Sequence, residues 1–272
     1  MKKKLTAFVL VVVLFISAAP MATLGTFEGL VRVLVPPTLV FDAVYTFRDG
    51  LAWVRKDGRS GFVNRYGEVV IPLEFEFAAV FFHDGLARVG RYYDGRYLFG
   101  YINKAGEMVV PYQFTFSEAF RGGLARVGMD GLQGFINTSG EVVVPIEFGH
   151  IAGFVDGLSP AQRDNIWGVI DQRGNTVIPF TYSSISYMGQ GLFRVTTLGE
   201  WEYRRTGIVN RYNEVIVPAE FERIGYFREG LAEVVLDGQV GFINKDGALV
   251  IPLRDGHVGI RGEAARWWLW WA

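Results

Sequence analysis

The chain has no cysteine and only three histidines in 272 residues. Without cysteine, disulfide bonds, zinc–thiolate sites, iron–sulfur clusters and a cysteine nucleophile are excluded. The histidines are His83, His150 and His257, and no two of them have the spacing of metal ligands on one helix. A phosphate-binding glycine loop, a nucleophile elbow and a calcium loop are also missing. We therefore predict no metal site, no cofactor and no catalytic residue.

An excess of charge of either sign is also lacking. The 27 Lys and Arg residues nearly balance the 28 Asp and Glu residues, and the formal net charge is −1. Basic residues are spread along the chain, whereas nucleic-acid-binding proteins concentrate them on one surface. We expect no nucleic-acid partner.

Charge is completely missing from a long stretch near the N-terminus. Lys2, Lys3 and Lys4 are followed by no charged residue until Glu28. This pattern predicts an export signal over residues 1–26, and the length of the stretch also fits an uncleaved membrane anchor. Both interpretations place the rest of the chain outside the cytoplasm. We expect a protein that is secreted or anchored to the outer face of the cytoplasmic membrane, with membrane contact only through this segment if it is uncleaved.

Glycine, in contrast, is abundant, with 34 residues, and it recurs at fixed intervals. Twelve-residue segments such as GFVNRYGEVVIP begin at Gly61, Gly100, Gly134, Gly168, Gly207 and Gly241, at intervals of 39 or 34 residues. A Gly-Leu pair stands before each segment. The distance from its glycine to the segment glycine is 11 residues in four copies, 15 in copy two and 16 in copy five. We interpret the extra residues as insertions in the loop between the first two strands.

The repeats divide the chain into three parts. Residues 27–252 form a β-repeat array of six full copies, and an unpaired Gly29-Leu30 marks a partial copy at its N-terminus. Residues 253–272 depart from the repeat and end in a Trp-rich tail. The tail fits three interpretations: a cap on the last copy, a docking site for a partner or membrane interface, or sequence that is not natively coded.

Each copy predicts three antiparallel strands. The second and third strands are joined by a tight hairpin with a left-handed residue, which is glycine in all copies but one. These turn residues are Gly67, Gly106, Gly140, Gly174, Asn213 and Gly247. The return strand, such as Val69–Ile71, is apolar on both faces, so we expect neighbouring copies to cover it on both sides. The predicted fold is an all-β open superhelical array; the alternative is a six- or seven-bladed β-propeller.

The repeat resembles that of the bacterial WG-repeat (KWG-type) family over about residues 27–252. The match is close where Phe120–Val127 reads FRGGLARV and Gly134–Asn137 reads GFIN. Only Trp167-Gly168 keeps the Trp-Gly pair for which the family is named. The resemblance implies a β-rich repeat array, often exported, with no established catalytic motif.

One column of the repeat is rich in residues that favour binding. Three residues after the glycine of Gly-Leu stand Arg32, Trp53, Arg88, Arg126 and Arg194. Arginine and tryptophan are over-represented in binding surfaces, so stacked copies would align these side chains along a groove for a peptide, protein or anionic glycan. The alternative is a solvated strand face paired with nearby acids.

These observations favour an exported, non-catalytic module that binds a protein or glycan, or acts as a scaffold, at the cell envelope. A propeller-type carbohydrate-active enzyme is the first alternative. It requires the two insertions, with Tyr92–Asp94 and Glu200–Glu202, to meet across a pocket. The second alternative is a purely structural spacer. The sequence identifies no specific ligand.

Overall fold

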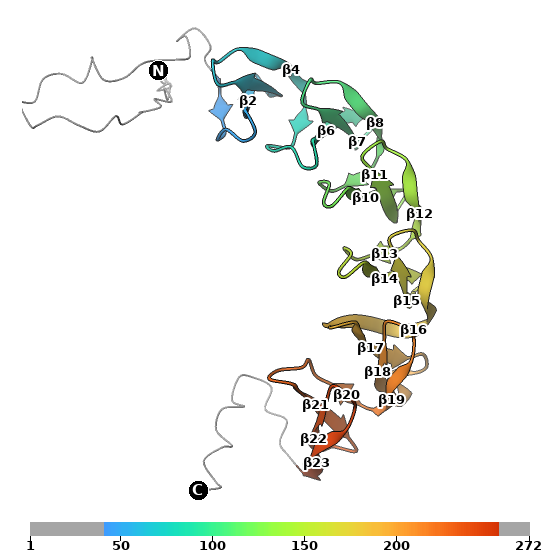
Figure 1. Cartoon of the computed structure of the whole chain (residues 1–272). Coiled ribbons are helices and arrows are strands. Elements are labelled where there is room, and N and C mark those ends of the chain that lie inside the picture. The colour runs from blue at the N-terminus through green and yellow to red at the C-terminus, as the bar shows by residue number, and fades with distance from the viewer. Residues whose placement is uncertain (1–40, 256–272) are drawn as a thin grey trace, which may run out of the picture. The chain divides into compact units, whose positions relative to one another are not determined.

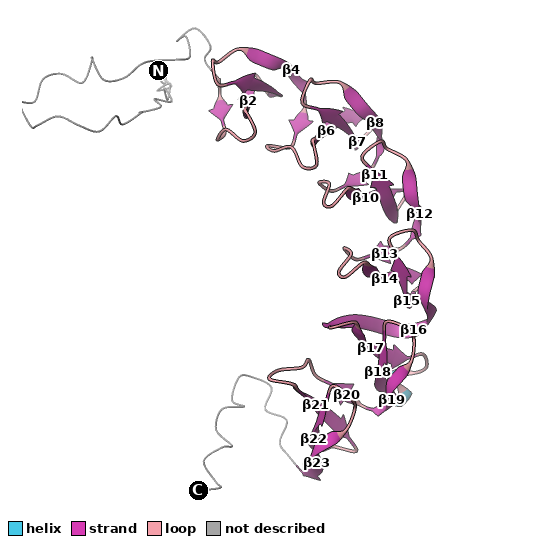
Figure 2. Ribbon diagram, viewed as in Figure 1, coloured by secondary structure: helices cyan, strands magenta, loops and turns pink. Residues whose placement is uncertain are grey.

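A computed structural model describes residues 41–255, which form β-strands, turns and one short 3-10 helix, η2 (Trp201–Tyr203) (Figure 2). The prediction of an all-β repeat fold is confirmed. The predicted leader (1–26), Arg32 and most of the Trp-rich tail lie outside the described residues. Within residues 41–255 no helix has the length and apolar character needed to cross a bilayer.

The chain divides into two compact units, residues 1–130 with 135–142, and residues 131–134 with 143–272. Its first three sheets each have four strands in sequence order (Figure 1). The first contains β1 (Ala43–Val44), β2 (Leu51–Lys56), β3 (Arg59–Asn64) and β4 (Val69–Phe75). The second contains β5 (Phe77–Ala78), β6 (Leu86–Tyr93), β7 (Arg96–Asn103) and β8 (Met108–Phe114). The third contains β9 (Phe116–Ser117), β10 (Leu124–Met129), β11 (Leu132–Asn137) and β12 (Val142–Phe148).

The remaining strands form a seven-stranded and a four-stranded sheet. The seven-stranded sheet contains β13 (His150–Ile151), β14 (Leu158–Arg163), β15 (Ile166–Asp171), β16 (Thr176–Gly189), β17 (Leu192–Thr197), β18 (Thr206–Asn210) and β19 (Val215–Phe221). The last sheet contains β20 (Arg223–Ile224), β21 (Leu231–Leu236), β22 (Gln239–Asn244) and β23 (Leu249–Asp255). We call the six copies modules one to six. Modules four and five share the seven-stranded sheet because β16 continues from the return strand of one into the first strand of the next.

Each module has one strand more than the sequence predicts. The connector after the return strand contributes a short strand, such as Phe77–Ala78, which pairs antiparallel with the first long strand of its module. These strands have only two residues in five modules, too short to produce an alternating pattern in the sequence. They form the fourth strand of each of these modules.

The second hairpin turn of each module is locked by a left-handed residue. In module one, the Gly67 amide donates to the Asn64 carbonyl at 2.9 Å, and the Asn64 amide donates to the Glu68 carbonyl at 2.9 Å. Gly67 has a φ of +79°, and its one non-glycine equivalent, Asn213, has a φ of +63°. Asparagine tolerates this region better than most residues, which explains the substitution in module five.

The glycine that opens each segment is required by a β-bulge. The register between β3 and β4 shifts on both sides of Phe62, which brings the return strand against Gly61. A Cβ atom on Gly61 would lie 2.5 Å from the Ile71 carbonyl oxygen, and one on Gly100 would lie 2.4 Å from that of Val110. The other four segment glycines meet the same overlap, at 2.5 to 2.8 Å. This close backbone approach explains why the glycine recurs in all six copies.

The return strand forms the sheet edge in five modules, and its proline lies there, exposed to solvent. The prolines are Pro72, Pro111, Pro145, Pro218 and Pro252. Proline has no amide hydrogen to offer an approaching strand, so it discourages edge-to-edge aggregation.

The core lies within and between neighbouring modules. Ile71, the third apolar residue of its return strand, is fully buried, and so are Val110 and Ile178 at the equivalent positions. The prediction that both faces of the strand are covered is wrong for its first residue, and in modules one and six also for its second, since Val70 is 39% and Val250 is 52% exposed. Val69 is exposed, as are Met108, Val142, Val215 and Leu249 at the equivalent positions. These residues directly follow the hairpin turn, at the edge of the sheet.

The insertion in module two is not an enlarged loop. It lengthens β6 and β7 to eight residues each, and their pairing continues to Tyr93 opposite Arg96 across an Asp94-Gly95 turn. In module five the added residues form the loop that contains η2. The same kind of insertion in the sequence thus has two different structural outcomes.

Candidate binding surface

The described members of the Arg/Trp column lie on β2, β6, β10 and β17 and are half-buried. Trp53 packs against a core cluster that includes Phe62 and Phe82. Arg126 lies over the Phe116 ring, with 5.4 Å between the guanidinium carbon and the ring centroid, and pairs with Glu118 at 2.5 Å. A ligand groove along this column stays a prediction.

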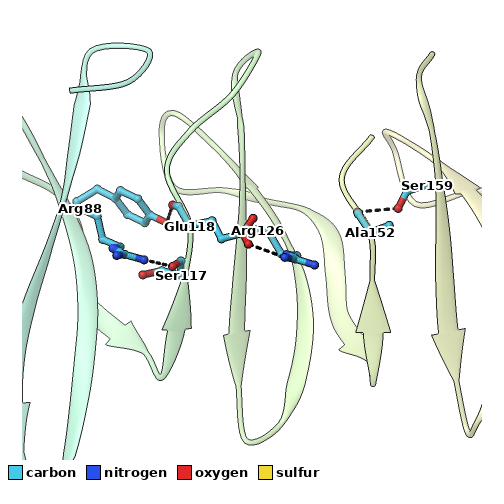
Figure 3. Close-up of polar contacts among 7 residues, drawn as sticks. Arg88, Ser117, Glu118, Arg126, Ala152 and Ser159 are labelled. Carbon is cyan, nitrogen blue, oxygen red and sulfur yellow. Dashed lines mark hydrogen bonds and ion pairs between the residues drawn. The ribbon is translucent and has the colours of Figure 1, made fainter. Parts of the chain in front are cut away.

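Arg88 links module two to module three. Its guanidinium carbon lies 4.9 Å from the Phe77 ring centroid and 5.3 Å from that of Phe99, and its Nη1 donates a hydrogen bond to the Ser117 carbonyl (Figure 3). Because Ser117 belongs to the short strand of the next module, the guanidinium bridges the boundary between two sheets.

Arg194 repeats this arrangement between modules five and six. Its Nη1 donates to the Ile224 carbonyl at 2.7 Å, and its guanidinium carbon lies 4.7 Å from the Tyr226 ring centroid. Ile224, like Ser117, is the second residue of a short strand. At these two positions the arginine therefore has a structural role that the sequence pattern alone does not reveal.

Tyr101 reinforces the boundary between modules two and three. Its hydroxyl donates to the Glu118 carbonyl at 2.6 Å, and its ring packs edge-on against Phe120 with 4.8 Å between centroids. Burial raises the pKa of Tyr101 to about 12. The hydroxyl therefore remains a neutral donor at physiological pH.

In four modules a glutamate follows the turn residue, and its carboxylate helps to lock the second hairpin turn. These glutamates are Glu68, Glu107, Glu141 and Glu214. Asn64 Oδ1 accepts from the amides of Tyr66 and Glu68, and its Nδ2 donates to the Glu68 carboxylate at 2.7 Å. In module four the two side chains are exchanged: Asp171 is the acceptor, and Asn175 donates to it at 2.9 Å. The pair therefore stabilises the turn with donor and acceptor in either order.

Glu141 gives this turn a testable pH dependence. Hydrogen bonds from Asn137 and then Ser139 lower the pKa of Glu141 below its ordinary 4.5. The bonds stabilise the folded state above pH 4.5, and this contribution is lost as the pH falls through the lowered pKa. We expect Ser139→Ala to raise the Glu141 pKa part of the way to 4.5 in a carboxyl NMR titration. An unchanged value would show that Ser139 does not contribute.

The lengthened hairpin β6–β7 carries a strip of aromatic rings on one face. Tyr92 and Tyr97 pair across the strands with centroids 5.2 Å apart, and the Tyr97 ring stacks on Phe99 at 6.2 Å. Phe99 in turn meets Phe77 edge-on at 5.8 Å. The rings become more exposed toward the hairpin end, where Tyr92 and Tyr97 are both accessible to solvent.

This strip, which we call the aromatic strip (Phe77, Tyr92, Tyr97 and Phe99), was missed by sequence reasoning, which treated the insertion as a loop. A signal was present in RYYDGRYLF, since residues that alternate around an Asp-Gly turn share one face of a hairpin. Gly90 makes room for it: a Cβ there would lie 3.0 Å from the Phe99 ring.

A groove of about 380 Å³ lies at the base of this hairpin, toward module one. Its charged lining residues are Arg59, Glu74, Glu76 and Arg91. Arg59 pairs with Glu76 at 3.2 Å, and the Glu76 carboxylate also accepts from the Tyr92 amide at 2.6 Å. The groove therefore holds fixed donors and acceptors on the face of the hairpin opposite the aromatic strip, since Arg91, which lines it, alternates with Tyr92 along β6.

The insertion in module five also presents aromatic side chains. Trp201 and Tyr203 of η2 are exposed, and the Arg204 guanidinium carbon lies 5.6 Å from the Trp201 ring centroid. The two insertions belong to different compact units. In the described part of the chain, no three His, Asp or Glu side chains are grouped to hold a metal ion.

Three comparisons with known proteins were informative to different degrees. No curated protein matches the sequence. The chain is similar to solved structures of the tricorn protease (12% identity, 78% of this chain, 26% of that chain, TM-score 0.27) and of Kluyveromyces lactis Hsv2p (7%, 75% of each chain, 0.35). The chain thus spans about a quarter of the length of the tricorn protease.

The family model described as "WG containing repeat" matches six stretches, residues 32–59, 61–90, 99–132, 134–165, 167–201 and 207–239. These stretches together include well over half of the chain, and those after the first begin at or next to the segment glycine and so span the boundary between two modules. The chain belongs to the WG-repeat family.

Proposed function

We propose that this WG-repeat protein is a non-catalytic binding module of the cell envelope and that its aromatic strip recognises a glycan. The observation that carries the proposal is the pair of exposed rings, Tyr92 and Tyr97, on a hairpin that only module two lengthens in this way. The export pattern of residues 1–26 supports a location outside the cytoplasm.

The chemistry of the strip suits a sugar ring. A pyranose has an apolar face of C–H groups and a rim of hydroxyls, so it stacks on an aromatic ring while its hydroxyls need donors and acceptors. Tyrosine supplies both an apolar ring and a polar hydroxyl at low cost in conformational entropy. The exposed Tyr92 and Tyr97 hydroxyls supply this polar chemistry beside the rings, and the Glu76 carboxylate holds the backbone at Tyr92 by accepting from its amide.

The strip is also rigid before any ligand arrives. The cross-strand pairing from Leu86 to Tyr93 holds the hairpin, and Phe99 is fixed by Phe77 and by the Arg88 guanidinium. Preorganisation of this kind reduces the entropy lost on binding. The rest of the repeat array then serves as the scaffold that presents the hairpin.

The test is binding of the purified chain to insoluble cell-wall polysaccharides, measured by sedimentation, with a Tyr92→Ala/Tyr97→Ala variant. We expect the double substitution to weaken binding at least about tenfold, since each central aromatic contact contributes on the order of 1–2 kcal/mol. Tyr212→Ala is the matched control, because Tyr212 is exposed on a hairpin turn of module five. Equal binding by the wild type and the double variant would refute the assignment of the strip.

A further inference from the structure

The last module leaves uncovered a position that is buried in every module before it. Ile251 is 41% exposed, whereas Ile71, Val110, Val144, Ile178 and Val217 at the equivalent positions are between 0% and 3% exposed. Phe242, which pairs with Ile251 across the strands, is half-buried, while its equivalents Phe62 and Tyr101 are buried. We call Phe242 and Ile251 the end face.

In the earlier modules, the residue equivalent to Ile251 is covered by the second hairpin turn of the following module. A Cβ on Gly106 would lie 3.4 Å from Ile71, and one on Gly140 would lie 3.0 Å from Val110. A Cβ on Gly247 of module six would likewise lie 2.5 Å from the Ile216 carbonyl of module five. The turn glycines of modules two, three and six therefore rest on the return strand of the module before them. For Ile251, the described residues contain no such turn.

The chain supplies a candidate to replace that turn. Strand β23 ends at Asp255, and 17 residues follow. They include Trp267, Trp268, Leu269, Trp270 and Trp271. The tail residue Trp267 stands 12 residues after Asp255, and a random-coil linker of that length spans roughly 20 Å, enough to reach back over the last sheet.

We infer that residues 266–271 fold back onto the end face and cap module six. Repeat proteins require a terminal cap because the outermost repeat has no neighbour to bury its apolar side. A second copy of the chain could supply its first module instead. A tethered segment, however, acts at an effective concentration in the millimolar range, which exceeds that of a second copy in dilute solution.

The absence of cysteine makes the contact directly measurable. A double variant, Ile251→Cys/Leu269→Cys, is expected to form an intramolecular disulfide at least about ten times faster than Val215→Cys/Leu269→Cys. Val215 is the control, since it is more accessible (64% against 41% exposed) and lies on an edge strand of the same compact unit but is not part of the end face. Equal rates for the two pairs would overturn the proposal. Intermolecular disulfides from the first pair would overturn it in favour of a second copy.

Hydrogen exchange tests the same contact without new thiols. In a full-length variant with all four tail tryptophans replaced by serine, we expect the amides of β22 and β23 to exchange at least about tenfold faster. Trp201→Ser is the control, because Trp201 is 82% exposed in the loop of module five. Unchanged exchange in β22 and β23 of the tail variant would refute the cap.

Discussion

Replacing Gly100 by alanine is expected to destabilise the protein by about 3 kcal/mol, at the upper end of the range for overpacked sites. The new Cβ would lie 2.4 Å from the Val110 carbonyl oxygen and 3.0 Å from the Pro111 backbone. These neighbours are backbone atoms of the adjacent strand, so no side-chain rotation can relieve the overlap. The bulge between β7 and β8 must open, which also displaces the buried Val110. Urea unfolding followed by near-UV circular dichroism measures the loss.

Gly153→Ala is the matched control for this substitution. Gly153 is exposed, and a Cβ there would meet no atom within 4 Å. Alanine at Gly153 is expected to change the stability by less than about 0.5 kcal/mol. If the two variants unfold at the same urea concentration, the bulge does not require glycine, and the recurrence of this residue would need another explanation.

The segment glycine recurs in every copy, but the tryptophan before it does not. This difference shows which features of the fold the sequence can predict. Glycine at the bulge and the left-handed turn at Gly67 are backbone requirements, so they leave the same residue at the same spacing in every copy. The residue before the bulge, Trp167 in module four and Phe99 in module two, packs on a short-strand residue of its own sheet, and many side chains can do this. Repeat length, strand order along the chain and turn positions could therefore be predicted.

The features that the sequence did not predict depend on contacts across the module boundary. The arginine at position 88 has the same sequence context as a surface residue on a strand, yet Arg88 donates to a carbonyl of the next sheet. The two-residue strands were missed because their pairing partners are distant in the sequence and no periodicity can form in two positions. The exposed start of the return strand, such as Val69, was missed because apolar composition alone does not show where a neighbouring module ends.

Replacing Phe120 by alanine is expected to cause a comparable loss of stability, because Phe120 is buried at the boundary between modules two and three. Phe120 stands three residues before its Gly-Leu pair, is only 1% exposed and packs edge-on against Tyr101. Phe120→Ala removes a whole ring from the boundary between modules two and three and leaves a cavity. Such substitutions cost about 3–5 kcal/mol. We expect this loss in urea unfolding, with faster hydrogen exchange concentrated in β6 to β10, because stability in repeat proteins depends on nearest-neighbour contacts.

Phe47→Ala is the matched control, because Phe47 occupies the same repeat position in module one but is 41% exposed. The expected cost there is about 1 kcal/mol or less, as for most exposed side chains. The difference between the two variants therefore measures what covering by a neighbour contributes at one repeat position. Equal losses would mean that Phe120 stabilises its own module alone, and the covering of one module by the next would then not be the main source of stability in this array.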